Sequence, residues 1–442
     1  MALSRRNIEL LFLVIAGAVS TMAYVSVYAA RFREINRVSI IYGLIFVGIF
    51  FLLHLLVRFA LPQADPFLLP VTALLAAIGL TEIFRIRPAL ALTQGQWLLV
   101  GAGLFILTVL IVRDHMKLDH YRYIIGAIGL ALLIVTIVLG TTVNGAKLWI
   151  HAFGFSIQPS EFAKLAIVIF LAGYLNDKKA LLSVPTHHVL GVPLPAAKYF
   201  GPLLVMWVMS LAMLVFMKDF GMALLFMSIF VALMYMATTR IVYVVLGGGL
   251  FAAAAAIAVT VVPHVQDRFT TWLNPWPYAS TTGYQLLQSL FTIADGGVLG
   301  AGFGRGFLLY ANRQPVVPDL QTDFIFAAVA NEIGLLGAAG VILLYVLFMW
   351  RGFRIAVWAP DGFSKLLAAG LAFAFGLQTF IILGGVTRLI PLTGITLPFV
   401  SYGGSSITAN LMLVALLLMV SHRTNVVREG TDLERRRLAE RG

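Results

Sequence analysis

Stretches of about 20 mostly apolar residues, the length that a helix needs to cross a bilayer, recur along this chain between residues 8 and 421. Of the 442 residues, 60% are hydrophobic and only 11% are charged, whereas soluble domains carry charges at roughly a quarter of their positions. We therefore predict an all-α fold, a polytopic integral membrane helical bundle of about twelve transmembrane helices. The expected spans are residues 8–30, 38–60, 66–86, 94–113, 121–140, 159–176, 199–217, 219–239, 241–263, 321–350, 364–387 and 402–421.

The chain divides into three parts. Residues 1–140 hold the N-terminal transmembrane helices, residues 141–421 form a core with a long polar loop at about 264–320, and residues 422–442 make a basic tail. We interpret this tail, which ends in DLERRRLAERG, as a solvated segment, with a short amphipathic helix as the alternative. The first apolar run is too long for the core of a signal peptide, so we expect an uncleaved anchor.

Lysine and arginine fall mostly in alternate segments between the expected spans. Because cytoplasmic loops carry an excess of these residues, we expect both termini to be cytoplasmic. The net charge of +12 then follows from topology and from attraction to membrane lipids, so no nucleic acid partner is expected. The absence of cysteine excludes disulfides and thiolate chemistry, and the eight histidines show no metal-ligand spacing. No cofactor or metal site is predicted, and assistance by a divalent cation stays an open alternative.

Ionisable side chains at membrane depth are costly and usually face a cavity or a partner. Glu161 and Lys164 lie three residues apart at a helix start, and Lys218 and Asp219 interrupt a long apolar stretch. Arg388 lies in an irregular segment, TRLIPLTGITLPFVSYGGSS, where it would suit an anionic group such as a phosphate. The alternatives are a capped and paired helix start, the polar turn of a helical hairpin, and an interfacial arginine.

Four segments should reach the outer face of the membrane, and they contain all of these residues apart from Lys164, which follows the first of them. One of the four also contains GGVLGAGFGRG, which lacks the spacing of a Walker motif and is not followed by GK[ST]. We interpret that glycine-rich segment as a flexible loop rather than a phosphate-binding loop. The four segments are residues 144–161, 216–221, 264–320 and 384–406.

Five motifs, in order along the chain, resemble the signatures of the SEDS family of bacterial membrane proteins (RodA, FtsW and SpoVE). Residues 1–140 are similar to the longer N-terminal region of actinobacterial-type members, which would add two helices to the family's usual set. The motifs are NGAKLWI with QPSEFAKL, KDFGMALL, GYQLLQSLFTIADGGVLGAGFGRG, TDFIFAAVANEIGLLG and GGVTRLIPLTGITLPFVSYGGSS.

The resemblance implies a peptidoglycan glycosyltransferase of the bacterial cytoplasmic (inner) membrane. Its substrate would be lipid II, a disaccharide peptide on undecaprenyl pyrophosphate, and its partner a class B penicillin-binding protein. Whether the role is in elongation and cell shape, in division and the cell cycle, or in sporulation stays open. The reaction needs a general base near the attacking hydroxyl and positive charge near the pyrophosphate.

Several residues of this chain are candidates for substrate binding in that reaction. By resemblance, Glu161, Lys164 and Asp219 match residues that line the family's central cavity, and Tyr284 with Gln285 matches the end of the family's long loop. The full candidate set is Glu161, Lys164, Lys218, Asp219, Tyr284, Gln285 and Arg388.

The chain departs from the family at one position of the long loop, TWLNPWPYASTTGYQLLQS. The family places a catalytic aspartate where this chain has Tyr278, and a phenol with an ordinary pKa near 10 is a poor base at neutral pH. Asp267 and Asp295 are the nearest candidate replacements, with Asp319 further along and Asp323 interpreted as a helix cap. The alternatives are a non-catalytic scaffold of the cell-wall machinery, a lipid II transporter, and a secondary transporter of another kind.

Overall fold

The computed structural model describes residues 4–32, 37–143, 146–152, 154–183, 187–189, 192–194, 201, 204, 205, 208, 209 and 212–439. Ten helices within these ranges are long and apolar enough to cross a membrane, and the prediction of an all-α membrane bundle is confirmed. They are α1 (Arg5–Phe32), α2 (Arg37–Ala60), α3 (Leu68–Ile86), α4 (Pro88–Leu107, continued by the π-helix η1, Thr108–Val112), α6 (Arg122–Leu139), α9 (Phe220–Thr238), α10 (Ile241–Val261), α13 (Ile325–Trp358), α14 (Gly362–Val386) and α15 (Gly404–Ala439).

Two further spans were predicted from the sequence. The span 159–176 forms a helix, α7 (Pro159–Ser183), which packs among α6, α9 and α14. Its polar first and last turns lower its hydropathy below that of the other spans. The span 199–217 lies mostly outside the described residues, apart from a final π-helical turn, η2 (Met213–Met217).

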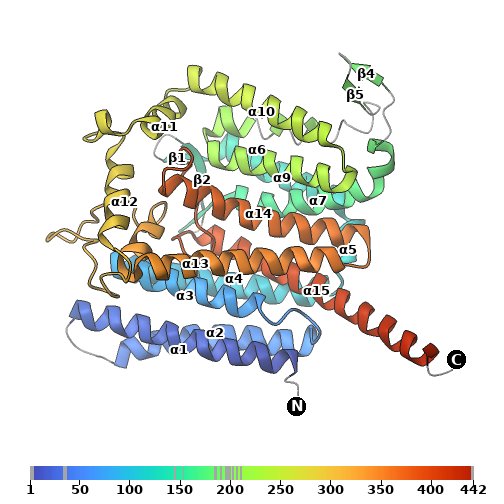
Figure 1. Cartoon of the computed structure of the whole chain (residues 1–442), viewed down its shortest axis with the longest axis horizontal. Coiled ribbons are helices and arrows are strands. Elements are labelled where there is room, and N and C mark those ends of the chain that lie inside the picture. Colours follow the sequence, from blue (N-terminus) through green and yellow to red (C-terminus); the bar gives the residue numbers. More distant parts are fainter. Residues whose placement is uncertain are drawn as a thin grey trace.

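The long helices run side by side, and both ends of the chain lie at the same end of the bundle (Figure 1). Burial orders them from the centre outward: 94% of the most apolar window of α15 is buried, against 6% for α10. α15 therefore forms the middle of the bundle, packed on α4, α7 and α14, whereas α10 presents nearly all of its side chains to the surroundings. Such an apolar exterior is expected where lipid replaces water around a helix.

The C-terminal tail is helical in the structure. α15 continues without interruption to Ala439, and the side chains of residues 426–431 are exposed. This part projects from the bundle in Figure 1. Of the two interpretations of this tail, the helix is present as far as Ala439, because the hydrogen-bonded backbone of α15 continues from its buried part. The exposure of residues 426–431 agrees with a solvated segment.

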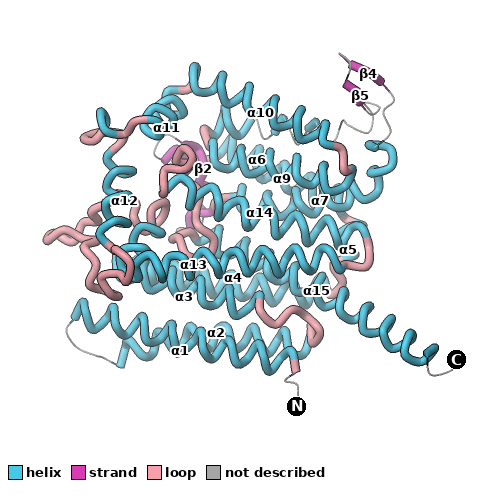
Figure 2. The backbone as a smooth tube through the Cα atoms, in the orientation of Figure 1, coloured by secondary structure: helices cyan, strands magenta, loops and turns pink. Residues whose placement is uncertain are grey.

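The long polar loop contains two helices, α11 (Pro263–Leu273) and α12 (Tyr284–Asp295), joined through a 3₁₀ turn, η3 (Trp276–Tyr278). They lie at the end of the bundle opposite to the termini, where most of the irregular backbone gathers (Figures 1 and 2). A five-residue helix, α5 (Met116–His120), lies at the other end.

The glycine-rich segment 296–306 is packed against α13 instead of forming a flexible loop. The backbone N–H groups of Ala301 and Gly302 donate to the carbonyls of Asn331 and Glu332. Gly334 lies directly opposite, with φ of +69°, so that a side chain there would meet the backbone of this segment. Glycine at these positions therefore allows the backbone of the segment to lie close to the backbone of α13.

Short strands, which were not predicted, occupy two connections. β1 (Thr141–Val143), β2 (Ala146–Ala152) and β3 (Phe155–Ile157) form an antiparallel sheet in the order β1-β2-β3. β4 (His187–Val189) and β5 (Val192–Leu194) form a separate antiparallel pair. The three-stranded sheet leads directly into α7, and the backbone N–H of Gln158 donates to the Ser405 hydroxyl at the start of α15, 2.8 Å away.

Candidate active site

A cavity of about 340 Å³ opens at the end of the bundle opposite to the termini. We call it the loop-end cavity. Its walls come from α11, α12, the turn before α13 and the segment that follows α14, so it joins parts of the chain that are far apart in sequence. It is lined by Asp267, Arg268, Thr271, Trp272, Thr282, Gln285, Leu286, Asp319, Asp323 and Leu392.

Three carboxylates face this cavity, and their surroundings differ. Asp267 is exposed on α11, whereas Asp319 and Asp323 are half-buried in the turn before α13. Burial, helped by the nearby Asp319 charge and opposed by Arg268, raises the pKa of Asp323 to about 7. A carboxyl group with a pKa near 7 matches the requirement for a general base at neutral pH.

Asp323 does not cap α13. The helix begins at Ile325, and its N-cap residue, Phe324, makes no side-chain capping hydrogen bond. The prediction of a helix cap is therefore wrong. The chain turns tightly from Asp319, whose carbonyl accepts hydrogen bonds from the N–H groups of Thr322 and Asp323, and this turn directs the Asp323 carboxylate to the cavity.

Arg268 supplies the positive charge of the loop-end cavity. Its Nη1 donates to the carbonyls of Thr393 at 2.7 Å and Leu392 at 3.2 Å. These bonds hold the guanidinium beside Gly394: a Cβ at that position would lie 3.4 Å from Arg268 Nη2 and 3.6 Å from Asp323 Oδ2. Gly394 has φ of +73°, and because it has no side chain, its backbone lies close to both Arg268 and Asp323.

Glu161 and Lys164 lie together in the core below this end, both almost fully buried. Lys164 Nζ donates to Glu161 Oε2 at 2.7 Å and to Gln378 Oε1 at 2.6 Å. Gln378 in turn donates from Nε2 to the carbonyl of Thr396 at 3.0 Å. The Lys164 ammonium therefore has both a counter-charge and a neutral acceptor, which lowers the cost of burying it.

Asp219 connects this buried pair with the loop-end cavity. Its Oδ1 accepts from the Met222 N–H at 2.9 Å and caps α9. Burial raises the pKa of Asp219 to about 6, while the Met222 bond and the Arg268 charge lower it and the Glu161 charge raises it. Lys218, in contrast, is exposed with φ of +56° and does not line the cavity.

Arg388 braces the wall of the cavity. Its Nε donates to the Trp272 carbonyl at 2.9 Å and its Nη2 to the Leu273 carbonyl at 2.7 Å. The indole Nε1 of Trp272 returns a bond to the Arg388 carbonyl at 3.2 Å. The guanidinium thus binds the C-terminal end of α11, and it does not line the loop-end cavity.

The other candidates from the long loop separate into two places. Gln285 lines the loop-end cavity, and its neighbour Tyr284 contacts the Tyr310 hydroxyl at 3.1 Å. Tyr278 lies on the η3 turn with 40% of its surface exposed and does not line the cavity. Asp295 is exposed at the last residue of α12, also outside the cavity lining.

Reading the sequence missed Arg268 and Gln378 as parts of the site. The signal for Arg268 was present, because Asp267 with Thr271 and Arg268 with Trp272 are four residues apart and share helix faces. No local signal identifies Gln378, which lies in the middle of α14. Among the residues that the structure describes, no group of three or more His, Asp or Glu side chains is arranged to hold a metal ion.

Comparison with known proteins identifies the family of this chain. Residues 67–426 match the family model of the cell cycle proteins FtsW, RodA and SpoVE. Peptidoglycan glycosyltransferase RodA of Mycobacterium tuberculosis is 43% identical over 95% of this chain and 91% of that protein. Stage V sporulation protein E of Bacillus subtilis is 33% identical over 81% of this chain and 96% of that protein.

Solved structures of the same family also match this chain. A chain from work described as "Structural coordination of polymerization and crosslinking by a peptidoglycan synthase complex" matches with a TM-score of 0.65 and 28% identity, over 82% of this chain and 98% of that one. Rod shape determining protein RodA of Thermus thermophilus matches with a TM-score of 0.58 and 26% identity, over 82% of this chain and 97% of that one. The chain therefore belongs to the FtsW, RodA and SpoVE family of cell cycle proteins, the SEDS family.

Proposed function

We propose that this protein is a peptidoglycan glycosyltransferase that polymerises lipid II in the loop-end cavity. The observation that carries the proposal is the meeting of Arg268 with Asp267, Asp319 and Asp323 around one cavity. Both catalytic requirements of the transfer, a base and a cation, are thus available within one site. Relatives named peptidoglycan glycosyltransferase, at 43% identity over nearly the whole chain, support the activity.

In the proposed reaction, the 4-hydroxyl of one lipid-linked sugar attacks the anomeric carbon of another. A new glycosidic C–O bond forms, the C–O bond to the pyrophosphate breaks, and undecaprenyl pyrophosphate leaves with the bonding electron pair. A cavity carboxylate takes the proton of the attacking hydroxyl. The Arg268 guanidinium stabilises the charge that develops on the pyrophosphate, as planar guanidinium groups do for phosphate oxygens.

Asp323 is the base in this proposal. Its raised pKa makes it a stronger proton acceptor than a carboxylate with an ordinary pKa, and its place beside Arg268 brings the base and the cation to the same reacting centre. Asp267 faces the same cavity from an exposed position and is the second candidate. Asp295 is the weakest of the three, since it lies outside the cavity lining.

The buried Glu161–Lys164 pair, with Asp219 between it and Arg268, forms a polar floor below the loop-end cavity. We assign to it the positioning of Arg268, through the charge of Asp219, and of the segment around Thr396, through the hydrogen bond from Gln378. Lys218, Tyr284 and Arg388 fit a role in shaping the approach to the cavity. No resident cofactor is needed for this chemistry, and a divalent cation on the pyrophosphate would act beside Arg268.

The proposed setting is the bacterial cytoplasmic membrane, with both termini in the cytoplasm and the loop-end cavity on the outer side. The grouping of both chain ends at one end of the bundle fits this orientation, as does the excess of basic residues there. A class B penicillin-binding protein is the proposed partner, because a similar solved chain comes from a peptidoglycan synthase complex.

The activity can be tested with purified full-length protein, alone and with its class B penicillin-binding protein, given lipid II in detergent. Glycan chains separated on a gel are the expected product. Tyr278→Phe should retain activity, since Tyr278 is outside the cavity lining. No glycan from the wild type or from Tyr278→Asp, with the partner present, would contradict the proposal.

One observation favours a second candidate function. This chain has Tyr278 at the loop position where the resemblance implies a catalytic aspartate, and a chain without catalysis would still bind lipid-linked sugars as a scaffold of the cell-wall machinery. The same experiment separates the two functions, because a scaffold would bind lipid II and the partner without producing glycan.

A further inference from the structure

A second polar cavity, of about 440 Å³, lies at the end of the bundle where the chain begins and ends. We call it the terminal-side cavity. It is formed where α1, the α2–α3 connection, the last turns of α13 and the exit of α15 meet. The lining residues that carry charge are Arg5, Asp65, Arg351, Arg354, Arg428 and Glu429.

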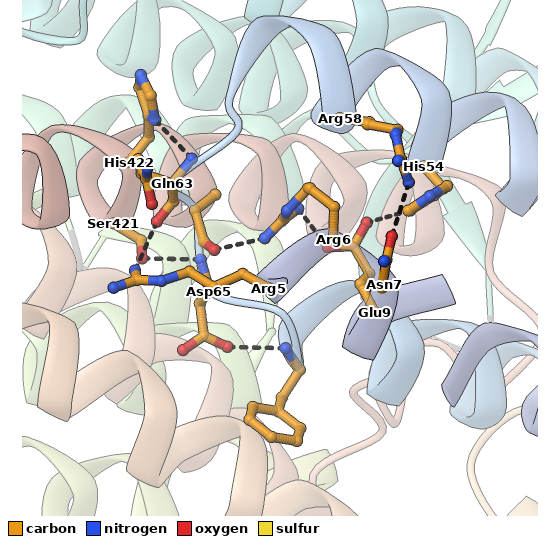
Figure 3. Close-up of polar contacts among 12 residues, drawn as sticks. Arg5, Arg6, Asn7, Glu9, His54, Arg58, Gln63, Asp65, Ser421 and His422 are labelled. Atoms are coloured by element: carbon orange, nitrogen blue, oxygen red, sulfur yellow. Dashed lines mark hydrogen bonds and ion pairs between the residues drawn. The ribbon is translucent and has the colours of Figure 1, made fainter. Parts of the chain in front are cut away.

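Two of the four arginines are neutralised by this chain. Arg351 Nε donates to Asp65 Oδ2 at 2.7 Å, and its guanidinium lies over the Phe67 ring, 4.6 Å from the centroid. Arg5 Nη2 lies 3.2 Å from Glu429 Oε1. Arg5 Nη1 also donates to the Gln63 carbonyl at 3.0 Å, and Figure 3 shows Arg5 beside the α2–α3 connection that carries Asp65.

The other two arginines are held by an aromatic ring instead of by carboxylates. Arg354 and Arg428 lie over the Trp358 indole, each with its guanidinium carbon 4.1 Å from the ring centroid. Neither makes an ion pair with any residue that the structure describes. Four arginines against two carboxylates leave two positive charges in the cavity, and the indole fixes the guanidinium planes without neutralising them.

The walls of the terminal-side cavity are amphipathic. Phe67, Ile355 and Trp358 contribute apolar surface, while Ser421 and Asn425 contribute polar groups. Trp358 is 40% exposed at the last residue of α13, and tryptophan near the end of a membrane helix is typical of headgroup depth. Basic pockets between transmembrane helices at this depth favour anionic lipid headgroups.

We propose that the terminal-side cavity binds the phosphate headgroup of an anionic phospholipid from the leaflet on the side of the termini. The Arg354 and Arg428 guanidinium groups bind the phosphate oxygens, and the apolar wall takes the first part of the acyl chains. Because the cavity is shared by α1, α13 and α15, bound lipid links the N-terminal helices to the core. The lipid acts here as a structural ligand, and the glycosyl transfer takes place at the opposite end of the bundle.

The test uses the full-length protein, stripped of lipid in a neutral detergent and titrated separately with phosphatidylglycerol, phosphatidylcholine and inorganic phosphate. Bound lipid is counted by native mass spectrometry, and the unfolding temperature is measured in parallel. We expect phosphatidylglycerol to bind and to raise the unfolding temperature more than either of the other two. The Arg354→Gln/Arg428→Gln variant should bind it about twenty-fivefold more weakly, at roughly fivefold for each arginine.

The matched control is Lys117→Gln/Lys178→Gln, which removes the same number of charges at the same end of the bundle but outside the cavity lining. This control should bind phosphatidylglycerol as the wild type does. An equal loss in the control would overturn the proposal in favour of a general attraction between the basic end of the bundle and anionic lipid in the micelle. Equal protection by inorganic phosphate would overturn the lipid as ligand and assign the cavity to a soluble phosphate group.

Discussion

At the scale of single residues, the loop-end cavity depends on one carboxyl group beside one guanidinium group. Asp323 is half-buried, so its charged form is costly, while the Arg268 charge nearby makes that form accessible near neutral pH. Burial likewise lowers the pKa of Arg268, opposed by Asp219 and Asp323. The two side chains therefore share one electrostatic environment, which a substrate with a pyrophosphate group would alter.

The pH dependence of polymerisation follows from Asp323. Its pKa is raised from an ordinary 3.8 to about 7, so the carboxylate that accepts a proton predominates only above pH 7. We expect kcat/KM to fall about tenfold per pH unit below this value. Initial rates between pH 5 and 9 measure the profile, and a rate that stays flat down to pH 5 would exclude Asp323 as the base.

Single residues also show where reading the sequence succeeds. The Glu161–Lys164 pair was predicted from helix spacing alone, and the structure places the two charges 2.7 Å apart. Asp323 could not be recognised in the same way, because an aspartate just before an apolar helix also fits a cap. Whether Asp323 caps the helix or lines the cavity depends on the tight turn at Asp319, where φ is +56°. The amino-acid composition does not predict that turn.

At the scale of elements, the cavity depends on how α11 is fastened to the segment after α14. Arg388 contributes two charge-assisted bonds to the carbonyls at the end of α11, and Trp272 returns one. These bonds fix the wall from which Arg268 reaches the cavity. The sequence analysis predicted a long polar loop here, so it found neither α11 nor the segment that contacts it, which lies more than a hundred residues away in sequence.

Arg388→Gln should therefore loosen this wall without removing a lining residue. We expect the unfolding free energy to fall by about 1–2 kcal/mol, since the group is half-exposed and hydrogen bonds from charged groups contribute little more than this. The rate of polymerisation should fall as well. The reduction in kcat should be larger than the reduction in the affinity for lipid II. SDS titration in mixed micelles measures the stability. Arg305→Gln, which changes an exposed arginine at the same end of the bundle outside the cavity lining, is the control.

At the scale of the whole molecule, α1 and α2 precede the residues that match the family model, which begin at residue 67. A buried network attaches these helices to the rest (Figure 3). Glu9 contacts Arg6 at 2.5 Å and His54 at 2.6 Å, and Arg6 also donates to the Ala64 carbonyl. The hydropathy of the sequence predicts the two helices. Because hydropathy is averaged over many residues, it does not predict the hydrogen bonds and ion pairs by which these few charged residues attach the helices to the rest of the bundle.

Removing the centre of that network should be costly. Glu9→Gln leaves Arg6 buried without its counter-charge, and we expect a loss of about 3–5 kcal/mol in unfolding free energy. Glu429→Gln breaks the exposed pair with Arg5 and should cost less than about 1 kcal/mol. Both can be measured by SDS titration in mixed micelles, and similar losses for the two variants would contradict the buried network.

The orientation of the bundle can be tested directly, because the chain has no cysteine. Single cysteines at two exposed positions, Asn312→Cys beside the loop end and Val427→Cys beyond the core part of α15, report the two sides. A membrane-impermeant maleimide added to intact cells should label position 312 and leave position 427 unlabelled until the cells are opened. The reverse pattern would place the loop-end cavity in the cytoplasm.

The most direct measurement is the rate of lipid II polymerisation by purified Asp323→Asn protein, compared with Asp295→Asn and the wild type. The substitution at Asp323 preserves the side-chain volume and removes the proposed base, so the rate should fall about a hundredfold or more. Asp295, exposed and outside the cavity lining, should tolerate the same change with a rate close to that of the wild type. Wild-type polymerisation by Asp323→Asn would contradict the assignment of the loop-end cavity as the site of glycosyl transfer.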